Sequence, residues 1–301
     1  SGLKQKLYRM RYGDSHWADY PLSKRHYLPR RAIVNQVRFE KYGDDINATC
    51  VLLSRGCSLK CAYCVYNVPG EIQAKPFDRI VEEIEYLKKE YQVVAINLKD
   101  EIALPFARKE CIGQLEAIAS TGIMWRGQTT VYGATEEKLK LASESGCVEM
   151  AVGIESASPF VREMVNKKMR DAQIKNFIDL CQKYNIKVRM CLILGMPGEP
   201  RDIVKMTTDF VQKMAPNSVY ASGMDPFPGS EIYNNQERFG IKYVDKDWGK
   251  HAHLLFRFSN EEVSGLPFEY EEETPWGKSF SRDEIISNLQ EVQAFCRENN
   301  L

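Results

Sequence analysis

Short apolar runs alternate with amphipathic stretches along residues 48–224. The runs typical of strands cover 49–54, 93–98, 125–131, 148–154, 187–194 and 218–223. The stretches between them repeat apolar residues at helical spacing over 77–90, 107–121, 135–145, 159–184 and 201–214. Thr135 is the predicted N-cap of the third helix. Successive strand-then-helix units predict parallel strands joined by crossover helices, in a sheet or a barrel.

Polar residues within these strands decide between a sheet and a barrel. Arg126, Gln128 and Arg189 interrupt strands that would stay apolar in a sheet covered by helices on both faces. A barrel whose interior holds a ligand accommodates them. We therefore predict an α/β fold, a partial (β/α)6 TIM-type barrel. Its polar residues either contact the ligand or form internal ion pairs.

The flanks lack this periodicity. Residues 3–47 are rich in Tyr and Arg, and the segment 225–301 begins with the turn-rich DPFPGS and ends in a helical pattern near 282–298. The predicted organisation is an N-terminal extension over 1–47, a core barrel over 48–232, and a C-terminal extension over 233–301 that covers the barrel.

The charge of the chain is balanced, with 41 Lys and Arg against 41 Asp and Glu. A neutral protein has no global attraction to nucleic acid or to an anionic membrane. No apolar run reaches the roughly 18 residues of a membrane span, and no apolar leader opens the sequence, so we expect a cytoplasmic protein. A local RNA-binding patch stays open through the basic residues Arg9, Arg11, Lys24, Arg25, Arg30 and Arg31.

Three of the nine cysteines are clustered directly after the first predicted strand, as Cys57, Cys61 and Cys64. Thiolates at this CxxxCxxC spacing can ligate three irons of a [4Fe–4S] cluster from one loop, and the fourth iron stays open for catalysis. A structural zinc site or a ferredoxin-like carrier needs a fourth ligand, which is not nearby. Chance clustering of three buried cysteines is the remaining alternative on spacing alone.

The segment CSLKCAYC resembles the cluster loop of the radical S-adenosylmethionine (SAM) superfamily, CxxxCxΦC, with Tyr63 at the aromatic position. The resemblance implies a [4Fe–4S] cluster on Cys57, Cys61 and Cys64, whose free iron binds SAM. It further implies that one electron, from a donor such as flavodoxin or ferredoxin, cleaves SAM to methionine and a 5′-deoxyadenosyl radical. That radical removes a hydrogen atom from a substrate.

The resemblance extends to later turns, over about residues 48–232. NLKDE follows the second strand, where the family has Gly-Gly-Glu, and GIES ends the fourth strand. LGMPGE ends the fifth strand, and DPFPGS follows the sixth. GIES and LGMPGE are similar to elements of the branch that contains cobalamin-dependent enzymes and methylthiotransferases. The residues assigned to SAM are Tyr63, Asp100, Glu101, Glu155, Ser156, Gly195 and Pro197, with Arg126, Gln128 and Arg189 from the strands. Several of these residues have a plainer interpretation as caps or turn residues.

Features that this sequence lacks limit which reaction can follow formation of the 5′-deoxyadenosyl radical. About 47 residues precede the barrel, without a DxHxxG motif, which disfavours cobalamin-dependent methyl transfer unless that domain lies on another chain or was removed. A methylthiotransferase needs three more clustered cysteines. We therefore predict oxidoreductase-type chemistry on a small molecule: epimerisation, dehydrogenation, elimination or rearrangement. The alternatives are a C-methyltransferase and an RNA-modifying enzyme.

Cys191 is the candidate hydrogen-atom donor of an epimerase, because it shares its strand face with Arg189. A buried, inert cysteine is the plainer interpretation. His251 and His253 are interpreted as ordinary surface histidines, with a polar substrate or a metal as the alternative.

Overall fold

The structure is a computed structural model that describes residues 35–38, 45–66, 72–247, 251 and 266–301. The basic patch that includes Arg9 and Arg31, and His253, lie outside these residues. The chain forms two compact units. The first unit comprises Ser1–Ser58, Val68–Ala151 and Asp179–Lys187, and the second comprises Leu59–Asn67, Val152–Ile178 and Val188–Leu301.

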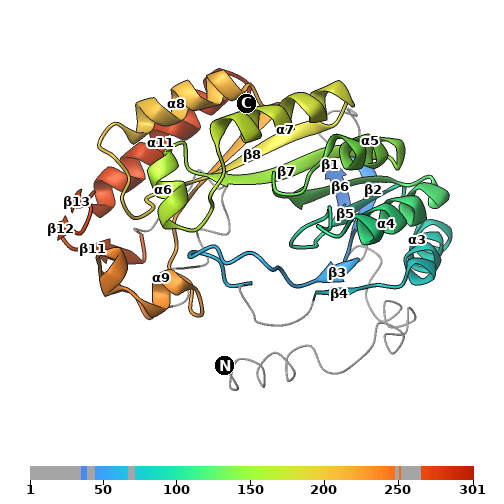
Figure 1. The fold of residues 1–301 in the computed structure, drawn as a ribbon, viewed down its shortest axis with the longest axis horizontal. Helices are drawn as coiled ribbons and strands as arrows, with labels where there is room; N and C mark the ends of the chain where they lie inside the picture. The colour runs from blue at the N-terminus through green and yellow to red at the C-terminus, as the bar shows by residue number, and fades with distance from the viewer. Residues whose placement is uncertain (1–34, 39–44, 67–71, 248–250, 252–265) are drawn as a thin grey trace. The chain divides into compact units, whose positions relative to one another are not determined.

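A sheet with parallel pairing forms the centre of the first unit. Its strands are β2 (Asp45–Val51), β5 (Ala95–Leu98) and β6 (Met124–Thr129), with β1 (Asn35–Arg38) antiparallel to β2 at the edge. The short strands β3 (Ser54–Arg55) and β4 (Gln73–Ala74) pair with each other. Helix α4 (Arg108–Thr121) lies between α3 (Phe77–Tyr91) and α5 (Glu136–Glu144), as Figure 1 shows.

The second unit is built on β8 (Lys187–Leu194) and its parallel neighbour β9 (Ser218–Gly223), while β7 (Cys147–Glu155) begins in the first unit and ends in the second. Helix α11 (Arg282–Glu298) packs against β9 and against α8 (Ile203–Met214) (Figure 1). The other elements are α6 (Pro159–Met164), α7 (Asp171–Lys183), α9 (Glu231–Asn234), the 3₁₀ turn Glu237–Phe239, and the strand pairs β10 (Ile241–Val244) with β11 (Phe268–Tyr270) and β12 (Glu273–Thr274) with β13 (Gly277–Lys278).

Local sequence accounts for the helix ends. The Thr135 side chain accepts a hydrogen bond from the Lys138 N–H, which confirms its role as N-cap. Ser281 and Glu284 form a capping box at the start of α11. The buried face of α11 then repeats at helical spacing, through Ile285, Leu289, Val292 and Cys296.

The six strands predicted from the sequence are all present, as β2 and β5–β9, and the predicted partial α/β barrel fold is confirmed. β8 and β9 have the predicted bounds, and β2 begins four residues earlier than predicted. In the described part of the chain, no helix is both long and apolar enough to cross a bilayer.

The prediction of one helix over 159–184 is wrong, because the buried Arg162 side chain organises a break between α6 and α7. Its guanidinium donates to the carbonyl oxygens of Ser156, Ala157 and Met169, at 2.8, 3.1 and 3.1 Å, and pairs with Asp171. The Met169 carbonyl lies in the break itself, whereas Ser156 and Ala157 precede α6, so one guanidinium satisfies backbone acceptors on both sides of α6. The connection that results carries Lys167 inward, with 6% of its surface exposed.

Replacing Arg162 by Met should lower the free energy of unfolding by about 3 kcal/mol, because three carbonyl oxygens lose their donor and Asp171 keeps only its more distant partner, Lys213. Urea denaturation measures the change. Lys168→Met is the matched control, since Lys168 forms an exposed pair with Glu163 and its loss should cost no more than about 0.5 kcal/mol. Equal unfolding midpoints for the two variants would contradict this role of Arg162.

Candidate cofactor site

The cysteine loop continues from one unit into the next. Cys57 belongs to the first unit and is half-buried, while Cys61 is buried and Cys64 half-buried in the second unit. A backbone bond of 3.1 Å from the Cys64 N–H to the Cys61 carbonyl closes a turn between them. Ala62, inside this turn, donates to Val165 O and accepts from Ile232 N, both at 2.9 Å. The backbone that carries Cys61 and Cys64 is therefore fixed from two directions.

Tyr63, Glu155 and Lys167 form a polar cluster beside this turn. The Tyr63 hydroxyl donates to Glu155 Oε1 at 2.7 Å, and Lys167 Nζ donates to the same oxygen at 3.0 Å. Lys167 Nζ also lies 3.2 Å from the Tyr63 hydroxyl oxygen. Sequence reasoning assigned Tyr63 and Glu155 to SAM but missed Lys167, whose partners are distant in sequence.

The protonation states in this cluster follow from burial and charge. Burial raises the pKa of Tyr63, and Glu155 raises it further, so Tyr63 is a neutral hydroxyl that donates. For Lys167, burial lowers the pKa, but Glu155 and the Cys61 and Cys64 thiols outweigh burial, so the net pKa is raised and the ammonium stays charged. Burial raises the pKa of Cys61, and Lys167 opposes that effect.

The backbone at the end of β7 is adapted to this cluster. Glu155 has a φ of 73°, in the left-handed region that non-glycine residues rarely adopt. A Cβ on Gly153 would lie 2.2 Å from Glu155 Oε1 and 3.1 Å from Lys167 Nζ. The glycine of the GIES motif therefore leaves the space that the carboxylate and the ammonium occupy. Ser156, the next residue, is buried, and its hydroxyl accepts from the Ser158 N–H.

In the first unit, Asp100 and Glu101 follow β5. Asp100 is fully buried and accepts from the Leu53 and Ser54 N–H groups and the Ser54 hydroxyl. Burial raises the pKa of Asp100, and these hydrogen bonds oppose the rise. Glu101 is half-buried and accepts from the Gly56 N–H at 3.1 Å. Both carboxylates hold the segment just before Cys57. Their assignment to SAM stays a prediction, and Glu101 is the more accessible of the two.

The polar strand residues lie on the less buried strand faces. In β6, Arg126 and Gln128 alternate with the buried Trp125, Gly127 and Thr129. In β8, Arg189 and Cys191 alternate with buried Val188, Met190 and Leu192 in the same way. The predicted shared face of Arg189 and Cys191 is therefore present, and the proposed hydrogen-atom transfer by Cys191 stays a prediction.

The turn after β8 is held by a buried carboxylate. Gly195 has a φ of 83°, which favours glycine, and its N–H donates to Glu199 Oε2 at 2.9 Å across a turn that contains Pro197. The hydroxyl of the half-buried Tyr270 donates to Gly195 O at 2.8 Å. Burial raises the pKa of Glu199 to about 8, although hydrogen bonds from Gly195 and Met196 oppose the rise. Glu199 is therefore neutral at physiological pH.

His251 is buried, so its interpretation as a surface histidine is wrong. Its Nδ1 lies 2.7 Å from Asp225 Oδ1, and its Nε2 lies 2.7 Å from Asp245 O. A carbonyl only accepts, so the Nε2–H group donates to Asp245 O, and Nδ1 is hydrogen-bonded to the Asp225 carboxyl group. Burial raises the pKa of Asp225 to about 6, while His251 opposes the rise. The DPFPGS motif was the only sequence signal near this pair.

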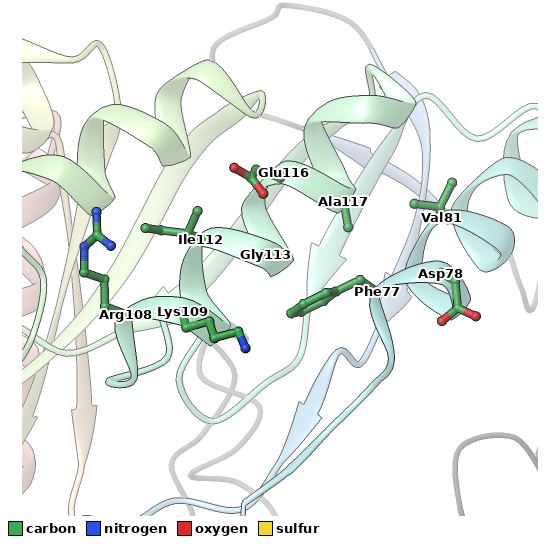
Figure 2. Close-up of a pocket in the computed structure, with 9 residues that line it drawn as sticks. All are labelled: Phe77, Asp78, Val81, Arg108, Lys109, Ile112, Gly113, Glu116 and Ala117. Atoms are coloured by element: carbon green, nitrogen blue, oxygen red, sulfur yellow. The ribbon is translucent and has the colours of Figure 1, made fainter.

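The pocket drawn in Figure 2 lies between the first turns of α3 and α4, and none of the predicted site residues lines it. Its volume is about 540 Å³. Phe77 extends across it toward Gly113, where a Cβ would lie 2.4 Å from the ring. The pocket therefore reflects how α3 packs on α4.

The cysteine donor set fits an iron–sulfur cluster. None of the nine cysteines, all within the described ranges, forms a disulfide. Three thiols within eight residues match the ligand chemistry of Fe–S clusters. Across the described ranges, no group of three His, Cys, Asp or Glu side chains is already arranged as a metal site. The fit therefore rests on ligand type and loop position.

A partial parallel α/β barrel with a three-cysteine loop after its first strand defines the class of cluster-dependent barrel enzymes. The family model of the Radical SAM superfamily matches residues 51–211, more than half of the chain. The chain belongs to this superfamily. Membership confirms that the protein is an enzyme and that its cofactors are a [4Fe–4S] cluster and SAM.

Two of the similar proteins are methyltransferases by name. The chain is 25% identical to an uncharacterized methyltransferase from Pyrococcus horikoshii, over 75% of this chain and 51% of the relative. It is 24% identical to bacteriochlorophyllide d C-12(1)-methyltransferase from Chlorobaculum tepidum, over 71% of this chain and 48% of the relative. These matches confirm the predicted branch. The chain spans about half the length of these relatives.

Among solved structures, the chain is similar to the radical SAM methyltransferase TsrM from Kitasatospora setae, determined with cobalamin and a [4Fe–4S] cluster bound. The TM-score is 0.60 at 17% identity, over 82% of this chain and 52% of TsrM. This similarity confirms the fold.

Glu199→Gln should flatten the dependence of stability on pH. The carboxyl has a pKa of about 8 when folded and 4.5 as its ordinary value, so the folded state binds the proton more tightly. Wild-type stability should therefore fall as pH rises from 4.5 to 8, by on the order of 1 kcal/mol per pH unit from this group. Urea unfolding at pH 6 and pH 9 tests this. Parallel losses in both proteins would exclude Glu199 as the cause.

Proposed function

We propose that Cys57, Cys61 and Cys64 hold the [4Fe–4S] cluster and that this chain directs the reductive cleavage of SAM toward a carbon atom of a small molecule. The cofactors supply one-electron cleavage of SAM to methionine and a 5′-deoxyadenosyl radical. The observation that carries the proposal is the fixed Cys61–Cys64 turn, bonded to Val165 and Ile232 and lying beside a buried ammonium group.

The remaining residues have supporting roles in this proposal. Asp100 fixes the backbone before Cys57, and Glu101 offers a partly exposed carboxylate for the SAM ammonium group. Arg126, Gln128 and Arg189 offer polar groups on the accessible strand faces. We assign the contacts with SAM and substrate to these faces, because they are the less buried faces of β6 and β8.

A second candidate is methyl transfer from SAM to carbon. The names of the relatives from P. horikoshii and C. tepidum favour it, since they match about three quarters of this chain. The two candidates differ in the fate of the SAM methyl group. Hydrogen abstraction alone leaves it in methionine, whereas methyl transfer removes it.

After anaerobic reconstitution with iron and sulfide, the wild type should form 5′-deoxyadenosine from SAM under a strong reductant. Cys61→Ala and Cys64→Ala should each lose the cluster absorbance and at least about 100-fold of this product, because a ligand is missing. Cys50→Ser is the matched control, since Cys50 is exposed on β2 and outside the triplet. Full cluster content and turnover in Cys61→Ala would refute the ligand assignment.

SAM labelled in its methyl group separates the two candidates. The label should remain in methionine, in one-to-one ratio with 5′-deoxyadenosine, if hydrogen abstraction is the whole reaction. Chromatography of the products, with and without added cobalamin, measures this ratio. Formation of S-adenosylhomocysteine, with the label in a third product, would favour methyl transfer instead.

A further inference from the structure

The segment that joins α6 to α7 is bonded repeatedly to the cysteine loop. Val165 O accepts from Ala62 N at 2.9 Å, and Asn166 Nδ2 donates to Lys60 O at 2.8 Å. Lys167 Nζ reaches the Tyr63 hydroxyl at 3.2 Å. Three consecutive residues thus contact the loop through one backbone and two side-chain groups.

Among these contacts, the one that Lys167 makes has the largest free-energy cost, because it buries a charged group. Its side chain is 8% exposed, and that of Glu155 is 9% exposed. Burying two charges costs several kcal/mol per ion, and the attraction between them often does no more than offset that cost. The pair also requires the left-handed backbone of Glu155 and the missing side chain at Gly153. Stability alone gives little reason for such an arrangement.

The ammonium group of Lys167 lies beside the residue that separates two of the proposed ligands. Lys167 Nζ is 3.2 Å from the Tyr63 hydroxyl oxygen and 6.0 Å from the centroid of the Tyr63 ring, and Tyr63 stands between Cys61 and Cys64 in the sequence. A buried positive charge is therefore fixed beside the turn that carries Cys61 and Cys64.

We propose that Lys167 is a positioning residue for the cluster. It ties the loop in place through Tyr63 and supplies the buried positive charge that favours reduction. The inference rests on the proposed function, because it takes Cys61 and Cys64 as cluster ligands. Reduction adds one negative charge to the cluster, and a buried cation nearby stabilises the reduced state. The electron itself comes from the external donor.

Lys167→Met should still bind the cluster, but the ratio of reduced to oxidised cluster at a fixed applied potential should fall about tenfold, which corresponds to about 59 mV for one electron. Lys167→Arg should restore most of that ratio. Glu155→Gln should raise the ratio, because it removes the opposing negative charge. A redox titration followed by electron paramagnetic resonance gives the ratio, and iron content is measured in the same samples.

Lys138→Met is the matched control. Lys138 is also a buried lysine, its Nζ donates to Pro105 O and Phe106 O at 2.8 and 3.0 Å, and it lowers the pKa of a cysteine outside the triplet, Cys111. Its loss should reduce stability and leave the ratio unchanged. If Lys167→Met does not fold, the other two variants test the proposal. A raised ratio of reduced to oxidised cluster in Glu155→Gln, with a ratio near that of the wild type in Lys167→Arg, would support it.

The inference is overturned if the wild type carries a reducible cluster and cleaves SAM while Lys167→Met and Glu155→Gln both keep its ratio. The proposed function then stands without it. A wild type that takes up no cluster under any reconstitution condition refutes the proposed function itself. These two failures are therefore distinguishable in one set of samples.

Discussion

The buried ion pair between Lys167 and Glu155 is the constraint on which the second unit depends most. It requires a glycine at 153, because a methyl group there would occupy the position of the carboxylate. It requires the chain to turn inward after α6, where the guanidinium of Arg162 binds the Met169 carbonyl in the break and the Ser156 carbonyl just before α6. It also provides the acceptor for the Tyr63 hydroxyl, which fixes the residue between two cysteines.

The first unit also has a buried carboxylate after a strand, but this carboxylate accepts from neutral groups and not from a charged lysine. Asp100 follows β5 as Glu155 ends β7, and each carboxylate binds a part of the cysteine loop or the residues that lead into it. Asp100 accepts hydrogen bonds from neutral N–H and O–H groups, which oppose the rise in its pKa caused by burial but do not cancel it. Glu155 is the last residue of its strand, and Asp100 follows the end of its own strand. In each unit, a carboxylate at a strand end therefore fixes neighbouring backbone or side-chain groups of the protein itself.

The sequence was sufficient for features that depend on local spacing. Alternation along β8 placed Arg189 and Cys191 on one face, and CxxxCxxC placed three thiols in one loop. The sequence was insufficient where the burial of a side chain depends on a partner that is distant along the chain. Helical periodicity continued through Lys167, but an acceptor on β7 and the hydroxyl of Tyr63, 104 residues away, draw that side chain inward. His251 is buried for the same kind of reason, since Asp225 lies 26 residues before it.

The division between shared and particular chemistry follows from where the family match ends. Residues 51–211 carry the cysteine loop and the carboxylates that hold it, so they account for what the superfamily has in common. Beyond residue 211 lie Asp225 and His251, a buried hydrogen-bonded pair just after β9. Asp225 Oδ2 is buried without a hydrogen-bond partner among the described residues, and such a group carries an energetic cost. This cost lies outside the residues that the family model matches, so it belongs to the part of the chain that the superfamily pattern does not explain.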